Sequence, residues 1–134
     1  MGQVEPRCVF LGDGECEVEF VDGERMRLKS GKVAGPGEVS PLHLLAASAL
    51  ACTVMNAGHA LEKEGIEAEV TGEARAEKDE RRNVVCSIDI VIRVKPEGDV
   101  DPEEVERVAR KGAAKCVITR TLGPVIVDVD VEVV

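Results

Sequence analysis

The sequence predicts an α+β fold with the element order βββ-α-ββ-α-β, in which two helices pack on one face of an antiparallel sheet. Three observations predict it. Apolar and charged residues alternate with period two near the N-terminus and again over residues 66–94. A long apolar segment without charged residues follows Pro41, and a second helical pattern follows Asp101. With 134 residues, the chain is expected to form one domain spanning residues 1–134.

The first three strands are predicted from alternation and turn signals. In residues 15–20 glutamate occupies every second position, which indicates a half-buried strand. Asp22-Gly23 is a strong hairpin signal, and residues 25–29 alternate again, with Met and Leu between Arg and Lys. A preceding strand is expected at residues 7–11, and the glycine-rich stretch after residue 30 is expected to be a loop.

The first helix is predicted to begin with Ser40 as N-cap and Pro41 in the first turn, and to end near Glu64, before Gly65. Residues 41–61 contain no Asp, Glu, Lys or Arg, which approaches the ~20 residues that span a bilayer. The segment includes several polar residues, however, and much of its apolar content is Ala. We therefore expect a core helix enclosed on several sides, and no membrane span.

A hairpin and a second helix complete the pattern. Residues 66–77 and 84–94 alternate on either side of a charged tip, as expected for two paired strands. Asp101 and the acidic residues after it are typical of a helix start. A stripe at helical spacing then runs through Cys116, and Leu122-Gly123-Pro124 ends the helix before a final strand.

Composition excludes several classes of function. The 26 acidic and 17 basic residues give a net charge of −9, and the chain has two Phe, no Tyr and no Trp. Nucleic acid and anionic membranes are therefore unexpected partners.

Five cysteines without a Cys-x-x-Cys pair predict neither a zinc site nor a disulfide framework, and we expect no metal and no cofactor. The start of the sequence does not have the pattern of a secretory signal, so we expect a cytoplasmic protein.

Two of the cysteines, Cys52 and Cys116, are predicted to lie in the middle of the two helices, 64 positions apart. Both have small residues nearby, which would let two helices approach as closely as a disulfide requires. From the residues alone, each can be an inert small hydrophobe or one half of a redox pair. The other three, Cys8, Cys16 and Cys86, fall on predicted strands and are expected to be small hydrophobes.

The pattern Ser-Pro-x-x-Leu-Leu-Ala-Ala at residues 40–47, followed by Ala-Cys-Thr-x-Met at residues 51–55 and a second helical cysteine, resembles the OsmC/Ohr family of peroxide-reducing proteins. The resemblance covers nearly the whole chain and implies an intertwined homodimer with two active sites at the subunit interface. It implies that Cys52 is the peroxidatic thiolate, which becomes a sulfenic acid, and that Cys116 resolves it as a disulfide. A dithiol reductant then reopens the disulfide. An apolar surround would favour organic hydroperoxides.

The sequence departs from the family pattern around the thiolate. Well-characterised members have a Glu early in the first helix, where this chain has Leu42 and then His43. They also have an Arg that contacts the thiolate, where this chain offers Lys29 and Lys32. Lys supplies the positive charge but lacks the planar, forked guanidinium group of Arg. We expect Lys32 and His43 to take part in the substrate site. The competing cations are Arg25, Arg27 and Arg120.

The sequence thus favours a thiol-dependent peroxidase that acts on organic hydroperoxides through Cys52 and Cys116. Two alternatives remain open. The missing Glu would also suit a non-enzymatic family member that binds a hydrophobic small molecule at the dimer interface. A permanent structural disulfide between the two cysteines is the third possibility.

Overall fold

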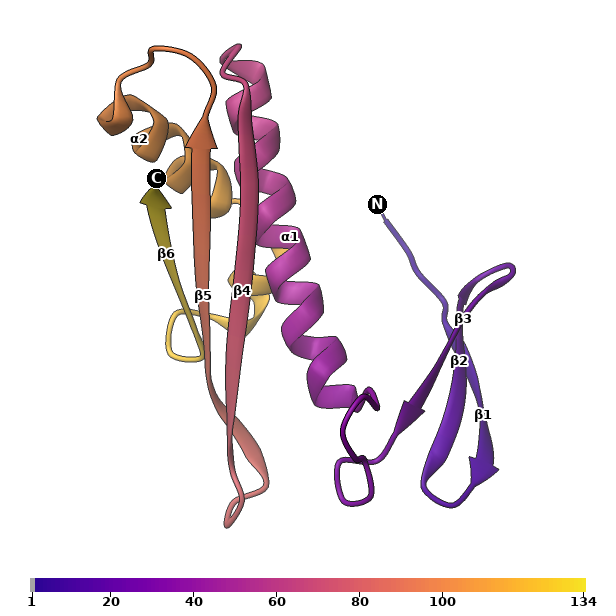
Figure 1. Ribbon diagram of the computed structural model, residues 1–134. Coiled ribbons are helices and arrows are strands. Elements are labelled where there is room, and N and C mark those ends of the chain that lie inside the picture. The colour runs from indigo at the N-terminus through magenta and orange to yellow at the C-terminus, as the bar shows by residue number, and fades with distance from the viewer. Residues whose placement is uncertain (1) are drawn as a thin grey trace. The chain divides into compact units, whose positions relative to one another are not determined.

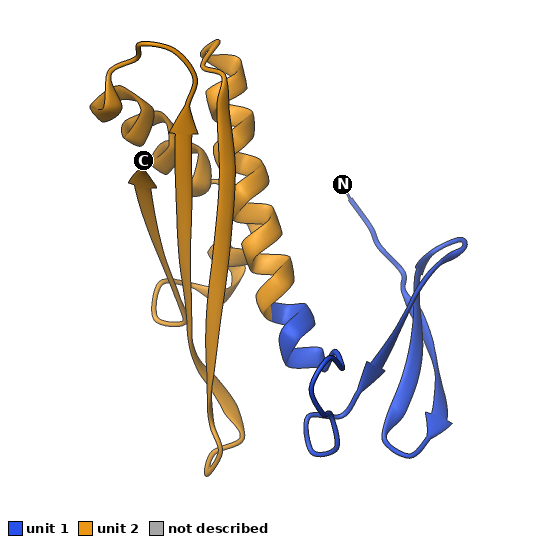
Figure 2. Ribbon diagram, in the orientation of Figure 1, with its two compact units in different colours: residues 1–45 blue, residues 46–134 orange. Residues whose placement is uncertain are grey.

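The computed structural model describes residues 2–134 and contains two compact units, one ending at Leu45 and one running from Ala46 to Val134 (Figures 1 and 2). The α+β class and the order of strands and helices agree with the sequence prediction. Each unit has its own three-stranded sheet, with strand orders β1-β2-β3 and β4-β5-β6. The expectation that the chain forms one domain stays a prediction.

The first unit is an antiparallel meander of β1 (Arg7–Gly12), β2 (Glu15–Val21) and β3 (Glu24–Lys29). The predicted alternation is confirmed, because the glutamates of β2 face the cations of its neighbours. Glu19 pairs with Arg7 at 2.8 Å and with Arg25 at 3.3 Å. The other face is apolar, and within the described chain Phe10 on it is 73% exposed.

Helix α1 (Pro41–Lys63) has the predicted bounds. At its start the backbone N–H of Ser40 donates to Nδ1 of His43 at 3.1 Å, which closes the first turn. At its end Gly65 has a φ of +70°, a conformation that favours glycine. One stripe of the helix is buried, formed by Ala49, Thr53, Ala57 and Leu61.

By length and composition alone, α1 could cross a membrane, a property that core helices of soluble proteins share. Only 22% of its apolar 18-residue window is buried within this chain. The prediction that this helix is enclosed on several sides is therefore not met by a single copy. Among its large apolar side chains, Met55 is 65% exposed.

The second unit pairs β4 (Ala68–Asp79), β5 (Val84–Pro96) and β6 (Val127–Val133). Strands β4 and β5 are antiparallel, but β5 and β6 are parallel, so the prediction of an antiparallel sheet is wrong for this pair. A parallel pair needs a crossover connection. Residues 97–126 supply it and contain both remaining helices, which lie with α1 on one face of the sheet (Figure 1).

The second predicted helix is interrupted. It forms α2 (Pro102–Ala113) and a short α3 (Val117–Leu122), so the prediction of a continuous helix through Cys116 is wrong. Cys116 has an extended backbone, with φ −62° and ψ 121°, and is the N-cap of α3. The break places the Cys116 side chain at the start of a helix and not on a helical stripe.

Helix α2 packs on β5 and β6 and closely against α1. The core contains alternate residues of β5, from Ile88 to Val94, together with Val105 and Ala109 of α2. Arg110 ties α2 to β6, because its guanidinium donates to Asp130 at 2.9 Å. A Cβ atom on Gly112 would lie 2.6 Å from the carbonyl oxygen of Asn56, so α2 approaches α1 at a point where only glycine fits.

Candidate active site

The structure brings Cys52 and Cys116 together as free thiols that are hydrogen-bonded to one another. Cys52 lies on α1, directly before the buried Thr53, and Cys116 precedes α3. Helix α2 lies close to α1 at Gly112. The chain therefore leaves the end of α2 near the middle of α1, and this places Cys116 beside Cys52. Two sulfur atoms at hydrogen-bond distance need only a short approach to reach the ~2.05 Å of a disulfide.

Cys116 is fully buried and surrounded by donors. The backbone N–H of Thr119 donates to its Sγ at 3.4 Å. Burial acts to raise the pKa of this thiol. Hydrogen bonding with Cys52, with the Thr119 backbone N–H and with the Thr53 and Thr119 hydroxyls outweighs burial and lowers the pKa to about 7. The Thr53 hydroxyl itself donates to the carbonyl oxygen of Ala49 at 2.7 Å.

Cys52 is half-buried and has the opposite shift. Burial, followed by its hydrogen bond to Cys116, raises the pKa of the Cys52 thiol, although backbone hydrogen bonds from Ile118 and Val117 oppose the rise. The amide nitrogen of Asn56 also reaches its Sγ, at 3.4 Å. The expectation that Cys52 is the peroxidatic thiolate stays a prediction.

The contact from Asn56 gives a testable prediction. An Asn56→Asp variant has nearly the same shape but would place a carboxylate beside Cys52, and a like charge disfavours the thiolate that must form there. We expect oxidation of Cys52 by cumene hydroperoxide at pH 7 to slow by about tenfold, the effect of one pKa unit. Mass spectrometry of quenched time points measures the rate. Asn83→Asp, in the exposed turn between β4 and β5, is the matched control. An unchanged rate in Asn56→Asp would show that this contact has no effect on the thiol.

Of the remaining predicted site residues and competing cations, only Arg120 lies close to Cys116 in the sequence. Lys32 and His43 lie in the first unit, where both are exposed, and His43 accepts the N–H of Ser40. Arg25 and Arg27 are paired with glutamates of β2. Arg120 is exposed on α3. The roles of Lys32 and His43 at the substrate site stay predictions.

Three residues at the thiol pair were missed by the sequence reasoning, namely Thr53, Asn56 and Thr119. A signal for two of them was available, because Asn56 follows Cys52 by one helical turn and Thr53 is its neighbour. Thr119 could be found only by placing the break before α3, since its backbone N–H reaches Cys116 through the N-cap geometry.

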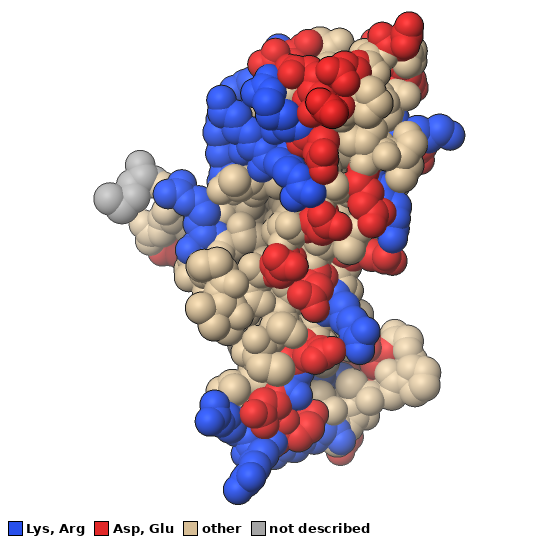
Figure 3. Space-filling model, turned by 90° about the vertical axis from the view of Figure 1, so that its left-hand side faces the viewer, with Lys and Arg blue, Asp and Glu red and all other residues tan. Residues whose placement is uncertain are grey.

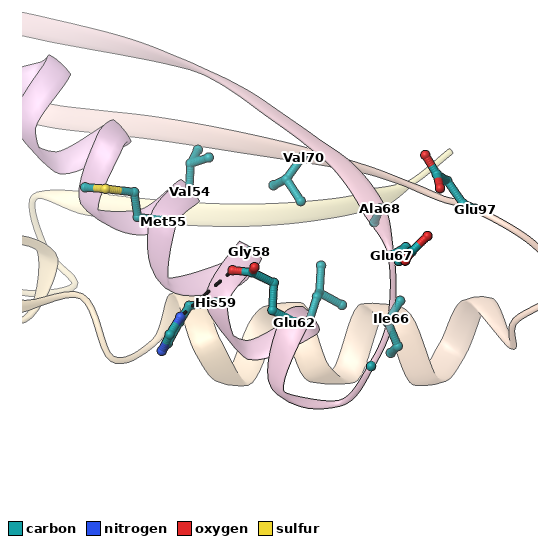
Figure 4. A pocket seen from close by; sticks show the side chains of 12 residues that line it. Val54, Met55, Gly58, His59, Glu62, Ile66, Glu67, Ala68, Val70 and Glu97 are labelled. Atoms are coloured by element: carbon teal, nitrogen blue, oxygen red, sulfur yellow. Dashed lines mark ion pairs between the residues drawn. The ribbon is translucent and has the colours of Figure 1, made fainter.

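A groove of about 920 Å³ lies beside the C-terminal half of α1 and the start of β4 (Figure 4). Its lining is mixed, with Val54, Met55, Ile66 and Val70 beside polar residues. Acidic residues also line it, and Glu62 lies 4.0 Å from the Nδ1 of His59. The groove can accommodate an apolar group, although none of its lining residues is a cysteine.

Charge on the face shown in Figure 3 is mixed, with groups of Lys and Arg bordered by Asp and Glu. A narrow cleft between α1 and α2 collects Lys63, Arg107, Lys111 and Lys115, together with Glu64. Arg107 is paired with Glu104 at 2.6 Å. The basic residues are thus interspersed with acidic ones in a chain of net charge −9.

Comparisons with known proteins give one family model that matches this chain. Residues 34–130 match the family described as OsmC-like protein. A protein of Methanocaldococcus jannaschii, itself uncharacterised, is 28% identical over 102 residues, which is 76% of this chain and 54% of that protein. The chain therefore spans about half the length of this curated relative.

Solved structures show the same fold. An OsmC-like protein of Mycoplasma pneumoniae has a TM-score of 0.80 at 14% identity, with 99% of this chain and 96% of that chain covered. An OsmC-like protein of unknown function from Vibrio cholerae gives 0.80 at 15%, with 100% of both chains covered. The organic hydroperoxide resistance protein OhrB of Bacillus subtilis gives 0.66 at 22%, with 99% and 98% covered.

Proposed function

The chain belongs to the OsmC-like protein family, and from this premise we propose that it is a thiol-dependent peroxidase that reduces organic hydroperoxides through Cys52 and Cys116. The observation that carries the proposal is the hydrogen-bonded pair of free thiols, one half-buried and the other fully buried. A half-buried thiol can meet a peroxide, and a buried partner beside it can trap the sulfenic acid before further oxidation.

The two thiols differ in a way that suits the two halves of a catalytic cycle. Cys52, the more accessible sulfur, attacks the peroxide and becomes the sulfenic acid. Cys116 then closes the disulfide. When a dithiol reductant attacks the Cys52 sulfur, Cys116 leaves, and a thiol with a pKa of about 7 is a good leaving group at neutral pH. The protein's own residues carry both steps, without metal or cofactor.

A homodimer is part of the proposal. The apolar surface of α1 that one chain leaves uncovered and the exposed apolar face of the first sheet both support burial by a second copy. In the intertwined arrangement that the family resemblance implies, each active site lies at the subunit interface. Lys32 and His43 would reach the substrate there. We place the protein in the cytoplasm, where dithiol reductants keep such a pair reduced.

The test is peptide mapping by mass spectrometry after one equivalent of cumene hydroperoxide is added to reduced protein. We expect rapid formation of a single disulfide, between Cys52 and Cys116. Cys8 and Cys86 are exposed and serve as internal controls, because a non-selective oxidation would modify them as well. If Cys52 and Cys116 both stay free while peroxide persists, the peroxidase proposal is wrong.

The groove beside α1 favours a second candidate, a family member that binds a hydrophobic small molecule without chemistry. Its lining by Val54, Met55 and Ile66 supports this alternative. Protein purified without detergent and extracted into organic solvent should then release a stoichiometric apolar compound. A peroxidase should be empty after purification, so the extraction separates the two functions.

A further inference from the structure

Each sulfur of the thiol pair accepts a hydrogen bond from an N–H group. The side-chain amide of Asn56 donates to Sγ of Cys52 at 3.4 Å. The backbone N–H of Thr119 donates to Sγ of Cys116, also at 3.4 Å. Hydrogen bonds of this kind favour the charged form of the sulfur that accepts them. Attack on a peroxide needs one thiolate, whereas the chain provides donors for two. The geometry therefore suits a state in which both sulfurs are deprotonated.

The orientation of the Asn56 amide is set by a second contact. Its Nδ2 atom also donates to the backbone carbonyl oxygen of Cys52, at 2.8 Å. A carbonyl oxygen only accepts hydrogen bonds, so the amide nitrogen, and not the amide oxygen, faces Cys52. The donor from Thr119 belongs to the backbone and cannot change its role. Both sulfurs are thus held against donors, which is how neighbouring groups orient and stabilise thiolates that bind a metal.

The thiol pair offers a metal ion two sulfur ligands. Among residues 2–134, no group of three or more His, Cys, Asp or Glu side chains could hold a metal ion, so no third ligand of these types joins the pair. The other side chains that act on Cys116 are the neutral hydroxyls of Thr53 and Thr119. Structural zinc takes four protein ligands and catalytic zinc takes three, so zinc does not fit. Thiolates select soft ions, and Cu(I) is a soft ion that is stable with two sulfur ligands.

We propose that Cys52 and Cys116 together form a binding site for the soft monovalent cation Cu(I). A thiolate–metal bond is ~2.3 Å long for zinc, and a similar length lets one Cu(I) ion bridge two sulfurs up to ~4.6 Å apart. Two hydrogen-bonded sulfurs lie within that span. Binding releases the two thiol protons and leaves a bis-thiolate complex with one negative charge, without oxidation or reduction. The inference is independent of the proposed function, because it needs only the two thiols.

The two sulfurs differ in burial in a way that suits a bound ion. Cys52 is half-buried, which leaves one side open for entry, and Cys116 is fully buried, which keeps water from the other side. The sequence-based expectation of no metal followed from the absence of a zinc pattern, and a site with two sulfurs needs no such pattern. Bound Cu(I) would occupy both sulfurs that peroxide reduction uses. The ion is therefore not a cofactor of that reaction, and the two activities exclude each other on one chain.

The experiment is an anaerobic titration of reduced protein with Cu(I), added as its acetonitrile complex. Bicinchoninate competes for the ion, and its coloured Cu(I) complex reports the ion that the protein has not bound. The starting protein carries Cys8→Ser and Cys86→Ser, which remove the two exposed thiols. We expect it to withdraw one equivalent of Cu(I). Adding either Cys52→Ser or Cys116→Ser should abolish this binding. Retention of the equivalent in both of these variants overturns the proposal.

A further variant leaves Cys52 and Cys116 in place. Asn56→Leu removes the donor to the Cys52 sulfur at nearly constant volume, so the affinity for Cu(I) should fall about tenfold, as is usual when a group that supports a metal ligand is lost. Thr121→Val removes an exposed hydroxyl on α3 and is the control, with unchanged affinity. Equal affinities in Asn56→Leu and the starting protein would contradict the role of the donor. Stoichiometric retention of Zn(II) against a chelator of matched strength would contradict the two-sulfur site.

Alkylation places the ion at the thiol pair without any peroxide chemistry. One equivalent of Cu(I) should protect Cys52 from iodoacetamide, as measured by mass spectrometry, and equal modification with and without the ion overturns the proposal. A protein that retains Cu(I) but ignores cumene hydroperoxide has the metal site and is not a peroxidase. Formation of the Cys52–Cys116 disulfide by peroxide in a protein that does not retain Cu(I) overturns this inference and leaves the peroxidase proposal intact.

Discussion

A Cys52→Ser variant should consume organic hydroperoxide no faster than the uncatalysed background. The hydroxyl of Ser is a far weaker nucleophile than a thiolate, and no sulfenic acid can form at this position. Peroxide loss is followed directly, with excess dithiol reductant to sustain turnover. The side chain is only half-buried and differs by one atom, so the fold should persist, which a thermal melt confirms.

The matched control for this variant is Cys86→Ser, on the exposed part of β5. It should turn over at the rate of the unmodified protein. If Cys52→Ser retained that rate while Cys86→Ser lost it, the reactive thiol would be on the sheet and the assignment of the site would be wrong. Full activity in both variants would direct attention to Cys8, which is also exposed.

Replacing Gly112 by Ala should strongly destabilise the second unit. Its Cβ atom would lie 2.6 Å from the carbonyl oxygen of Asn56 and 2.6 Å from Cβ of Ala60, distances that force the two helices apart. Overpacking of this kind costs about 1–3 kcal/mol, against about 1 kcal/mol that Ala gains over Gly in a helix. Because one of the contacts is to backbone, we expect a net loss of about 2 kcal/mol, or about 6–10 °C in Tm.

Gly58→Ala on α1 is the control, since a Cβ atom there meets nothing within 4 Å. It should leave Tm unchanged or raise it slightly through helix propensity. Differential scanning calorimetry of the two variants checks the pair. A Gly112→Ala protein as stable as the unmodified one would mean that α1 and α2 are farther apart than the structure has them.

Much of the fold could be predicted because local patterns determine it. The glutamates of β2, the start of α1 at Pro41 and its end before Gly65 each follow from neighbouring residues, and the structure confirms them. The resemblance to the OsmC/Ohr family is likewise confirmed at the level of the OsmC-like family. Strand direction was harder. Alternation is the same in parallel and antiparallel strands, so nothing in residues 127–133 distinguishes the parallel pairing with β5.

The sequence singled out the two cysteines that the structure brings together, but it did not predict the hydrogen bonds around them. The spacing from Ala113 to Val117 continues a helical stripe, and the break at Cys116 depends on tertiary packing against α1. That break creates the N-cap contact, in which the backbone N–H of Thr119 donates to Sγ of Cys116. Helix propensity and hydrophobic periodicity do not predict a hydrogen bond between residues far apart in the sequence, nor its effect on the pKa of a thiol.

The parallel pairing of β5 and β6 has a consequence for the order in which the molecule assembles. Arg110 fastens α2 to β6, and β6 follows both cysteines along the chain. During synthesis, Cys52 therefore leaves the ribosome well before β6. Strand β6 is the strand that holds the crossover segment, residues 97–126, in which Cys116 lies. Parallel pairs close long loops and form slowly. The nascent chain passes through a stage in which Cys52 has left the ribosome without its partner, and its thiol then has the reactivity of an ordinary cysteine. The contact between the two thiols is therefore expected to form late, with the completion of the second sheet.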